Sequence, residues 1–296
     1  MSKPSVYFPL ARPMYGKSVE QVVRVFEAAG HKCSHTDEGQ DIMIGSDAGD
    51  TSTAKLQFNL NHGFGAKNIY WGTDGVEREK DKIQLVPSKW YKKVYARNGV
   101  EAEVVGMPRL DEAFKTRSDK ERTVLYAPTC HMELTSIPMI DARVLRLSGY
   151  GWRVRVKLHP SICEVEEQWK NAKSIYGDGH LETEDSGILT ARARIVVCDM
   201  ATTLLDAIVL DRPAIVMQTS VYLGCRYFSY RNPEWVFANC QYRAFNWYEA
   251  KERFKLLMHK DDPLAERRRR AAPFICEYRG EAASRVYDAV MRHWGK

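Results

Sequence analysis

The stretch "VVCDMATTLLDAIVLDRP" (residues 196–213) decides the fold. It begins as a short apolar run, which predicts a buried strand, and the run breaks at Asp199. Thr202 and Thr203 stand in the break, and the chain then resumes a helical pattern that carries Asp206 one turn in. A strand, a polar turn and a helix in this order form the repeating unit of α/β proteins with parallel sheets.

The same alternation continues in both directions along the chain. In the first half, apolar runs predict strands at 6–10, 41–45, 68–71, 82–86 and 102–106, and helical spacing predicts helices at 17–30 and 88–99. In the second half, strands are expected at 124–128, 153–160, 194–198 and 214–217, with helices at 138–151, 165–177 and 203–211. Because parallel strands need helical crossovers, the pattern predicts an α/β protein with two parallel sheets.

A polar, highly charged segment at 111–123 separates the two halves and indicates a connection between domains. We therefore place a first α/β domain over residues 1–115 and a second over 118–280. Residues 281–296 carry an apolar stripe at helical spacing, from Ala283 to Trp294, which predicts a last amphipathic helix.

Length and composition are those of an ordinary globular protein. The chain has 296 residues, of which 44% are hydrophobic and 28% charged, with a formal net charge of +6. It has no apolar run near the roughly 20 residues that cross a bilayer and no signal-peptide pattern, so we expect a cytoplasmic protein. Seven cysteines without CxxC spacing indicate neither a disulfide framework nor a zinc site. We expect no metal and no cofactor.

Ligands of open parallel sheets bind beyond the carboxyl ends of the strands, where helix N-termini offer N–H groups. In the 196–213 segment the strand ends at Asp199, and this rule brings Ala201, Thr202 and Thr203 to the turn entering the helix, where their N–H groups and hydroxyls would hold a phosphate. An equally weighted alternative makes Thr202 a helix N-cap and Asp206 an ordinary helix residue. Neither GxGxxG nor GxxxxGK[ST] occurs at a strand-to-helix turn, which argues against the common dinucleotide and P-loop sites.

A histidine beside a glycine-rich loop is a second candidate for chemistry. The segment "NHGFGAKN" (61–68) contains His62, followed by Gly63 and by Lys67. A loop histidine can serve as a general base, and glycines let the backbone approach a ligand closely. The structural alternative is a half-exposed histidine in a turn.

The remaining candidates share one feature, a polar side chain beside a proline at the end of a strand. They are Arg109 in "GMPRLDE" (106–112), Thr129 in "LYAPTCH" (125–131), and Lys157 and His159 in "KLHP" (157–160). Pro160 holds His159 extended at the strand end. Taken alone, Arg109 would more simply pair with a nearby acid, and His159 would more simply be a packed structural histidine.

Taken together and in this order, these segments resemble the CDP-glycerol glycerophosphotransferases of teichoic acid synthesis. The resemblance runs from about residue 58 to 218 and is strongest in "GMPRLDE" and in the 199–216 segment. It implies a GT-B fold, in which two Rossmann-like domains with parallel sheets face a central cleft and the C-terminal helix crosses back to the first domain. The first domain would then hold the acceptor and the second the nucleotide donor.

The resemblance also implies a role for each candidate. His62 matches the histidine that acts as general base on the acceptor hydroxyl, with Gly63 and Lys67 on the acceptor side, and His159 matches the second catalytic histidine, which contacts the donor phosphates. The group that binds the donor and its phosphates comprises Arg109, Thr129, Lys157, Asp199, Thr202, Thr203 and Asp206. Lys157 stands where the family has arginine, and lysine lacks the bidentate fork, so the identity of the donor stays open.

The function implied is metal-independent transfer of a glycosyl or glycerophosphate group from a CDP- or UDP-linked donor to an acceptor hydroxyl. The acceptor would be a glycan or a polyol phosphate, and such an enzyme would be peripheral to the membrane. An alternative is a bacteriophage-type DNA glycosyltransferase, since "ERRRR" (266–270) and a pI of about 8.8 suit nucleic acid. A nucleotide-sugar epimerase and a non-catalytic nucleotide-binding module are further alternatives, and the oligomeric state stays open.

Overall fold

The structure, a computed structural model, describes residues 3–9, 16–45, 52–60, 81–116, 122–130, 134–218, 233–259 and 262–296. These residues form two compact units. The first contains those up to Glu112 together with Pro273–Lys296, and the second contains Ala113–Ala272. The sequence predicted domain ends at residues 115 and 280, whereas the units divide after Glu112 and after Ala272. Both division points lie inside helices, α5 (Asp111–Lys115) and α13 (Ala265–Ile275).

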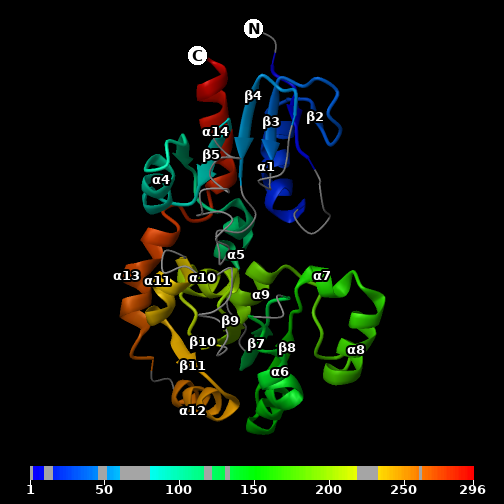
Figure 1. Ribbon diagram of the computed structural model, residues 1–296, viewed down its shortest axis with the longest axis vertical. Helices are drawn as coiled ribbons and strands as arrows, with labels where there is room; N and C mark the ends of the chain where they lie inside the picture. The colour runs from blue at the N-terminus through cyan, green and yellow to red at the C-terminus, as the bar shows by residue number, and fades with distance from the viewer. Residues whose placement is uncertain are drawn as a thin grey trace. The chain divides into compact units, whose positions relative to one another are not determined.

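The first unit contains a six-stranded parallel sheet. Its strands are β1 (Val6–Tyr7), β2 (Cys33–Ser34), β3 (Ile42–Gly45), β4 (Leu56–Asn59), β5 (Ile83–Val86) and β6 (Ala102–Val104), in the order β2-β1-β3-β4-β5-β6. Helices α1 (Gly16–Ala28) and α14 (Ala282–Trp294) share one apolar core with the sheet (Figure 1). Helix α4 (Lys89–Ala96) connects β5 to β6. The strand expected at 68–71 lies outside the described residues.

The "GMPRLDE" segment attaches α14 to this unit. Asp111 accepts hydrogen bonds from the backbone N–H groups of Ala282 at 3.0 Å and Ala283 at 2.8 Å, and so caps the helix. Gly106 has a φ of +94°, and a Cβ there would lie 2.9 Å from the Cβ of Ala282 and 2.9 Å from the carbonyl oxygen of Tyr278. Two residues of this segment are thus explained by the docking of the C-terminal helix.

Gly106→Ala is expected to destabilise the first unit more than Gly99→Ala does. Both glycines have positive φ, +94° and +73°, so both substitutions strain the backbone. A Cβ at Gly99 meets nothing within 4 Å, whereas one at Gly106 collides with Ala282 and Tyr278. The collision should add about 1–3 kcal/mol to the loss in unfolding free energy, measurable by urea denaturation. Equal losses in the two variants would contradict the close approach of α14.

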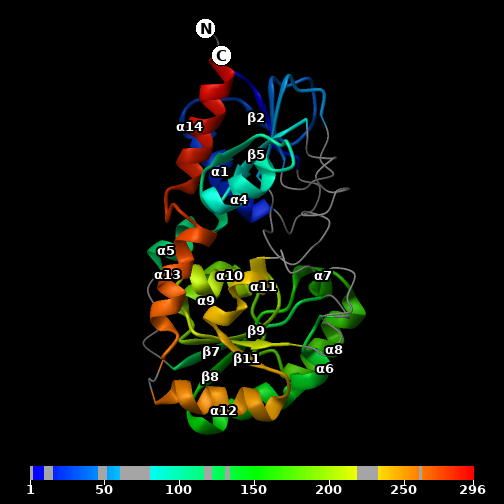
Figure 2. The same cartoon turned by 60° about the vertical axis from the view of Figure 1, so that its left-hand side comes forward.

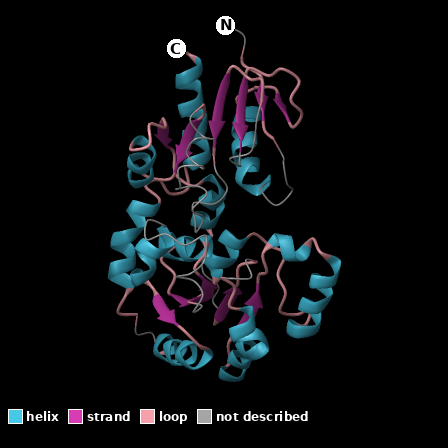
Figure 3. Cartoon of the chain, viewed as in Figure 1, coloured by secondary structure: helices cyan, strands magenta, loops and turns pink. Residues whose placement is uncertain are grey.

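The second unit contains a five-stranded parallel sheet (Figure 3). Its strands are β7 (Thr123–Ala127), β8 (Arg153–Val156), β9 (Ile195–Asp199), β10 (Ala214–Met217) and β11 (Tyr242–Ala244), in the order β11-β10-β9-β7-β8. Its helices are α6 (Ile137–Ile140), α7 (Pro160–Cys163), α8 (Glu166–Tyr176), α9 (Ser186–Arg192), α10 (Thr202–Val209), α11 (Pro233–Phe237) and α12 (Trp247–Met258), together with most of α13. The prediction of an α/β fold with two parallel sheets is confirmed.

One predicted helix differs in type. The 138–151 pattern predicts a single α-helix, but the structure has the short α6 followed by a 3-10 helix, η3 (Asp141–Tyr150). Asp141 lies at the junction with a φ of +45°, a conformation that a regular α-helix cannot accommodate. The apolar spacing still places Val144 and Leu147 in the core, which explains why the pattern was helical.

Candidate functional site

The candidate site lies at the carboxyl ends of three adjacent strands in the second unit. Strand β7 lies between β9 and β8, and the register pairs Ala127 with Cys198 and Tyr126 with Val156. The chain segments that follow these strands therefore leave the sheet at the same edge. Figures 1 and 2 show helices α7, α9 and α10 at this end of the strands. This edge gathers Thr129, Lys157, His159, Asp199, Thr202, Thr203 and Asp206.

Asp199 positions two neighbouring segments from inside the protein. Its carboxylate is fully buried and accepts hydrogen bonds from the backbone N–H of Thr129 at 2.7 Å and of Ser136 at 3.1 Å. Burial raises the pKa of Asp199 to about 7, while the hydrogen bonds from Ser136 and Thr129 act in the opposite direction. The resemblance assigns Asp199 to the group that binds the donor; in the structure its enclosed carboxylate holds two backbone segments through their N–H groups. Thr129, itself buried, meets Asp199 through its backbone.

The N-terminus of α10 is open to an anion. Ala201 is the N-cap residue, with extended backbone, and no side chain caps the helix within the described part of the chain. The alternative that Thr202 is the N-cap is therefore wrong. Thr202 and Thr203 are half-buried at the first two helical positions, whose N–H groups have no partner inside a helix. Asp206 is buried one turn further on, in a run of six buried residues, Leu204 to Val209.

His159 is held in one orientation by Ser161. It is the N-cap residue of α7, and its Nδ1 accepts a hydrogen bond from the backbone N–H of Ser161 at 3.2 Å. The Ser161 hydroxyl lies 2.7 Å from the same nitrogen. Because a backbone N–H can only donate, Nδ1 is the unprotonated nitrogen of the neutral ring, and the proton resides on Nε2. A neutral His159 is thus a hydrogen-bond donor through Nε2, the role that a phosphate oxygen requires.

Ser161→Ala is expected to raise the proportion of the Nδ1–H tautomer of neutral His159 about fivefold, because one hydrogen bond of about 1 kcal/mol to Nδ1 is lost. The backbone N–H bond remains, so the Nε2–H tautomer should still dominate. The ¹⁵N chemical shifts of the imidazole report the two tautomers directly. Ser161→Thr keeps the hydroxyl and should match the parent chain; a Ser161→Ala spectrum identical to both would show that the hydroxyl does not act on His159.

Lys157 brings a positive charge to the same edge. It follows β8 directly, its backbone N–H donates to the carbonyl of Tyr126 at 2.8 Å, and its Nζ donates to the carbonyl of Thr183 at 3.2 Å. Lys157 and His159 are two positions apart on an extended segment, so both belong to the loop between β8 and α7. A cation, a donating imidazole and an open helix N-terminus together can bind a phosphate or diphosphate.

The other sequence-based candidates are not part of this cluster as described. Arg109 belongs to the first unit, in the 3-10 helix η2 (Pro108–Leu110), where it is half-buried. His62, Gly63 and Lys67 lie outside the described residues.

The arginine run does not form the unpaired basic face that the DNA alternative suggested. Arg268 is only 2% exposed and forms ion pairs with Asp211 at 3.0 Å and Asp262 at 2.7 Å. Arg269 pairs with Asp211 at 2.9 Å. The two remaining members are also engaged within the chain, Arg267 with the carbonyl of Asn239 and Arg270 with Glu266. Arg268 is therefore a buried anchor of α13, whereas the side chains of Arg269 and Arg270 are exposed.

Two residues that matter for this geometry, Ser136 and Ser161, were not singled out from the sequence. Ser161 follows "HP", and a serine beside a proline is a local signal of a helix start. Ser136 precedes "IP" in the same way, and its hydroxyl lies 3.0 Å from that of Tyr126. Its bond to Asp199 spans 63 positions and leaves no local signal.

The described residues contain neither a candidate metal site nor a helix that could span a membrane. No group of three or more histidine, cysteine, aspartate or glutamate side chains among them could hold a metal ion. None of the helices that they form has both the length and the apolar character needed to cross a membrane.

Comparison with known proteins identifies the fold. No family model and no curated protein matches the sequence. Among solved structures, the wall teichoic acid polymerase TagF is similar with a TM-score of 0.71 and 12% identity, over 98% of this chain and 88% of that chain. The UDP-GlcNAc 2-epimerase from Neisseria meningitidis bound to UDP-GlcNAc is similar with a TM-score of 0.59 and 12% identity, over 97% of this chain and 99% of that chain.

A third similar structure is that of S. aureus MnaA with UDP, with a TM-score of 0.53 and 14% identity, over 100% of this chain and 81% of that chain. The parallel α/β architecture of the two units is thus that of GT-B enzymes, as the resemblance implied. At these identities the similarity establishes the fold.

Proposed function

We propose that this protein is a transferase that moves a glycosyl or glycerophosphate group from a CDP- or UDP-linked donor to an acceptor hydroxyl. The observation that carries the proposal is the group of residues at the carboxyl ends of β9, β7 and β8. There His159 is fixed as an Nε2–H donor by Ser161, at the same end of the sheet as Lys157 and the N-terminus of α10. These are the groups that a nucleoside diphosphate needs, both when bound and as the leaving group whose negative charge develops during transfer.

Each part of the site has a distinct role in this proposal. His159 and Lys157 bind the diphosphate, and Thr202 and Thr203 bind it through their N–H groups and hydroxyls. Asp199 keeps the segments at Thr129 and Ser136 in place. Asp206 supports α10 from within, and Arg109 is assigned to the donor phosphates only through the resemblance.

His62 is the proposed general base on the acceptor hydroxyl, beside Gly63 and Lys67. A histidine has a pKa near neutrality, which suits removal of a proton from an attacking hydroxyl. Neither the reaction nor the donor site calls for a metal ion, since the charge on the leaving group is met by N–H groups and cations. The acceptor is proposed to be a glycan or a polyol phosphate, and the protein to work in the cytoplasm or at the membrane surface.

A second candidate is a UDP-sugar 2-epimerase. It is favoured by the similarity to the Neisseria meningitidis enzyme over nearly the whole of both chains. An epimerase forms product from the nucleotide sugar alone, whereas a transferase needs an acceptor. Incubation of UDP-GlcNAc without acceptor, followed by NMR of the sugar, separates the two. The DNA glycosyltransferase alternative loses Arg268, which is buried in ion pairs with Asp211 and Asp262, and keeps the exposed Arg269 and Arg270.

The donor site is tested by calorimetry with CDP, UDP, GDP and ADP and their glycerol and sugar conjugates. Saturable binding of a cytidine or uridine diphosphate that is lost in His159→Ala would support the proposal. His259→Ala is a matched control, because His259 is an exposed histidine of the same unit, at the end of α12. Binding of none of these nucleotides by the folded protein would refute it. Binding without turnover with any acceptor would favour the non-catalytic module.

A further inference from the structure

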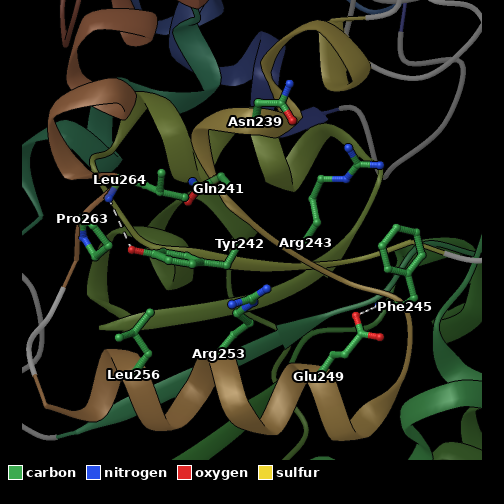
Figure 4. A pocket seen from close by; sticks show the side chains of 10 residues that line it. All are labelled: Asn239, Gln241, Tyr242, Arg243, Phe245, Glu249, Arg253, Leu256, Pro263 and Leu264. Atoms are coloured by element: carbon green, nitrogen blue, oxygen red, sulfur yellow. Dashed lines mark hydrogen bonds between the residues drawn. The ribbon is translucent and has the colours of Figure 1, made fainter.

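A groove along the edge strand β11 forms a second candidate binding site in the second unit. Its volume is about 520 Å³, it is open to solvent, and it lies between β11, α12 and the segment before α13 (Figure 4). Strand β11 ends the sheet on the side opposite to β8. The groove is therefore separate from the edge formed by β9, β7 and β8.

Arg243 supplies a fixed positive charge on one side of the groove. Its guanidinium donates two hydrogen bonds to the side-chain oxygen of Gln218, one from Nε at 2.9 Å and the other from Nη2. It also lies 5.2 Å from the ring centre of Trp235 and 5.7 Å from that of Phe245. None of these partners is an acid, so they orient the guanidinium without neutralising it.

Arg253 supplies a second positive charge from the opposite side. It extends from α12 toward β11, whereas Arg243 extends from β11 away from α12 (Figure 4). Arg253 is exposed and forms no ion pair with any described residue. The acid that lines the groove, Glu249, accepts hydrogen bonds from Phe245 N–H at 3.1 Å and Asn246 Nδ2 at 2.8 Å at the start of α12. The groove therefore attracts anions on both sides of the strand.

One side of the β11 backbone has no strand partner among the described residues. There β11 pairs with β10 alone, and Ala244 accepts a hydrogen bond across that pairing from the N–H of Gln218 at 2.9 Å. Since successive residues of a strand alternate in direction, the N–H and C=O of Arg243 face away from β10, into the groove. Phe245 lies two residues further on, so its N–H points to the same side of β11 as that of Arg243. It donates to Glu249 and not to β10, which agrees with the direction assigned to Arg243.

We infer that this groove binds an extended peptide segment with acidic side chains, added as a strand beside β11. Side chains of an added strand alternate between the two faces, so acidic residues on either face would meet Arg243 or Arg253. Leu256 on α12 and Leu264 in the segment before α13 offer apolar surface for an aliphatic residue (Figure 4). Small-ligand pockets enclose about 70–90% of the ligand surface, and this open groove does not enclose a small ligand to that extent. The inference does not rest on the proposed donor site.

The test is fluorescence polarisation of the full chain with a labelled, amide-capped hexapeptide of alternating glutamate and valine. Binding should be saturable. Arg253→Gln and Arg243→Gln should each weaken it about 2- to 5-fold, the range of partly exposed ion pairs. Arg146→Gln replaces an exposed arginine outside the groove and should leave binding unchanged. His159→Ala should also leave it unchanged, which separates this site from the donor site.

Two further peptides distinguish the occupants. The same peptide N-methylated at alternate residues cannot form the strand pairing and should lose most of its affinity. A version with lysine in place of glutamate should not bind. The inference is overturned if the parent peptide does not bind, if the lysine or N-methylated peptide binds equally, or if free glutamate competes at the same concentration. Arg253 is exposed, so its variant remains informative even if Arg243→Gln impairs folding.

Discussion

His62→Ala is expected to lower kcat by roughly 10²- to 10⁴-fold and to leave the affinity for a nucleoside diphosphate unchanged. His159→Ala is expected instead to weaken the affinity for the nucleoside diphosphate by roughly 10- to 100-fold. The two histidines would then divide the reaction, since one acts on the acceptor hydroxyl and the other on the donor phosphate. This division follows from the proposal that each binds a different substrate.

The expectation for His159 comes from its geometry. Its Nδ1 is occupied by the backbone N–H and hydroxyl of Ser161, so the ring cannot serve as a base through that nitrogen. A neutral ring presents Nε2–H, and a hydrogen bond from it to a charged phosphate oxygen contributes about 1.5–3 kcal/mol. Removing it should therefore act chiefly on binding.

Calorimetry with the donor diphosphate and steady-state kinetics with the full donor separate the two effects. The first measurement reports the loss of the hydrogen bond from His159, and the second reports the loss of the base. Equal losses of diphosphate affinity in both variants would contradict the division of roles. An unchanged kcat in His62→Ala would remove His62 from the role of base.

The sequence predicted those parts of the fold that depend on local pattern. The apolar runs of β9 and β10 and the helical spacing of α10 are each visible within a few residues, and the structure places them where expected. The edge strand β11 is three residues long, too short for a periodic signal, and was missed. The prediction of one α-helix over 138–151 was wrong for a different reason. Asp141 has a positive φ, and apolar spacing does not reveal such a backbone conformation.

The candidate site was predictable in its residue types but not in their roles. The rule that ligands bind at strand carboxyl ends selected His159 and Asp199 correctly as residues of one edge. The role of Asp199 depends on N–H donors 70 and 63 positions away, which no local pattern reveals. In the same way, Asp111 belongs to the "GMPRLDE" segment, yet its partner Ala282 is 171 positions away.

Asp199 should make the stability of the second unit fall as the pH rises from about 4 to about 7. Its pKa is raised by burial from 3.8 to about 7 in the folded chain. Within this window the unfolded chain has lost the proton while the folded chain keeps it, so each rise in pH favours unfolding. Below the window both states are protonated and above it both are ionised, so the contribution is constant there. The slope should approach about 1.4 kcal/mol per pH unit.

Asp199→Asn removes this titration and should flatten that part of the profile, measured by urea denaturation between pH 4 and pH 8. The absolute stability of the variant is less informative, because an amide can accept from only one of the two N–H groups and leaves the other facing an NH₂. Asp178→Asn, which changes an exposed aspartate of the same unit, serves as the control for the general effect of removing a carboxylate. A parent profile as flat as that of Asp199→Asn would contradict the buried titration.

Hydrogen exchange tests the same contacts residue by residue. In Asp199→Ala the amides of Thr129 and Ser136 lose their acceptor, and their protection should fall at least tenfold, since about 1.4 kcal/mol corresponds to a factor of ten. The amide of Val216, in the neighbouring strand β10, should keep its protection if the sheet remains intact. Loss at the first two positions with retention at the third would show that Asp199 positions the segments after β7. Because β7 pairs with β8, the strand that leads to His159, the same variant is also expected to weaken diphosphate binding if the proposed donor site lies at this end of the sheet.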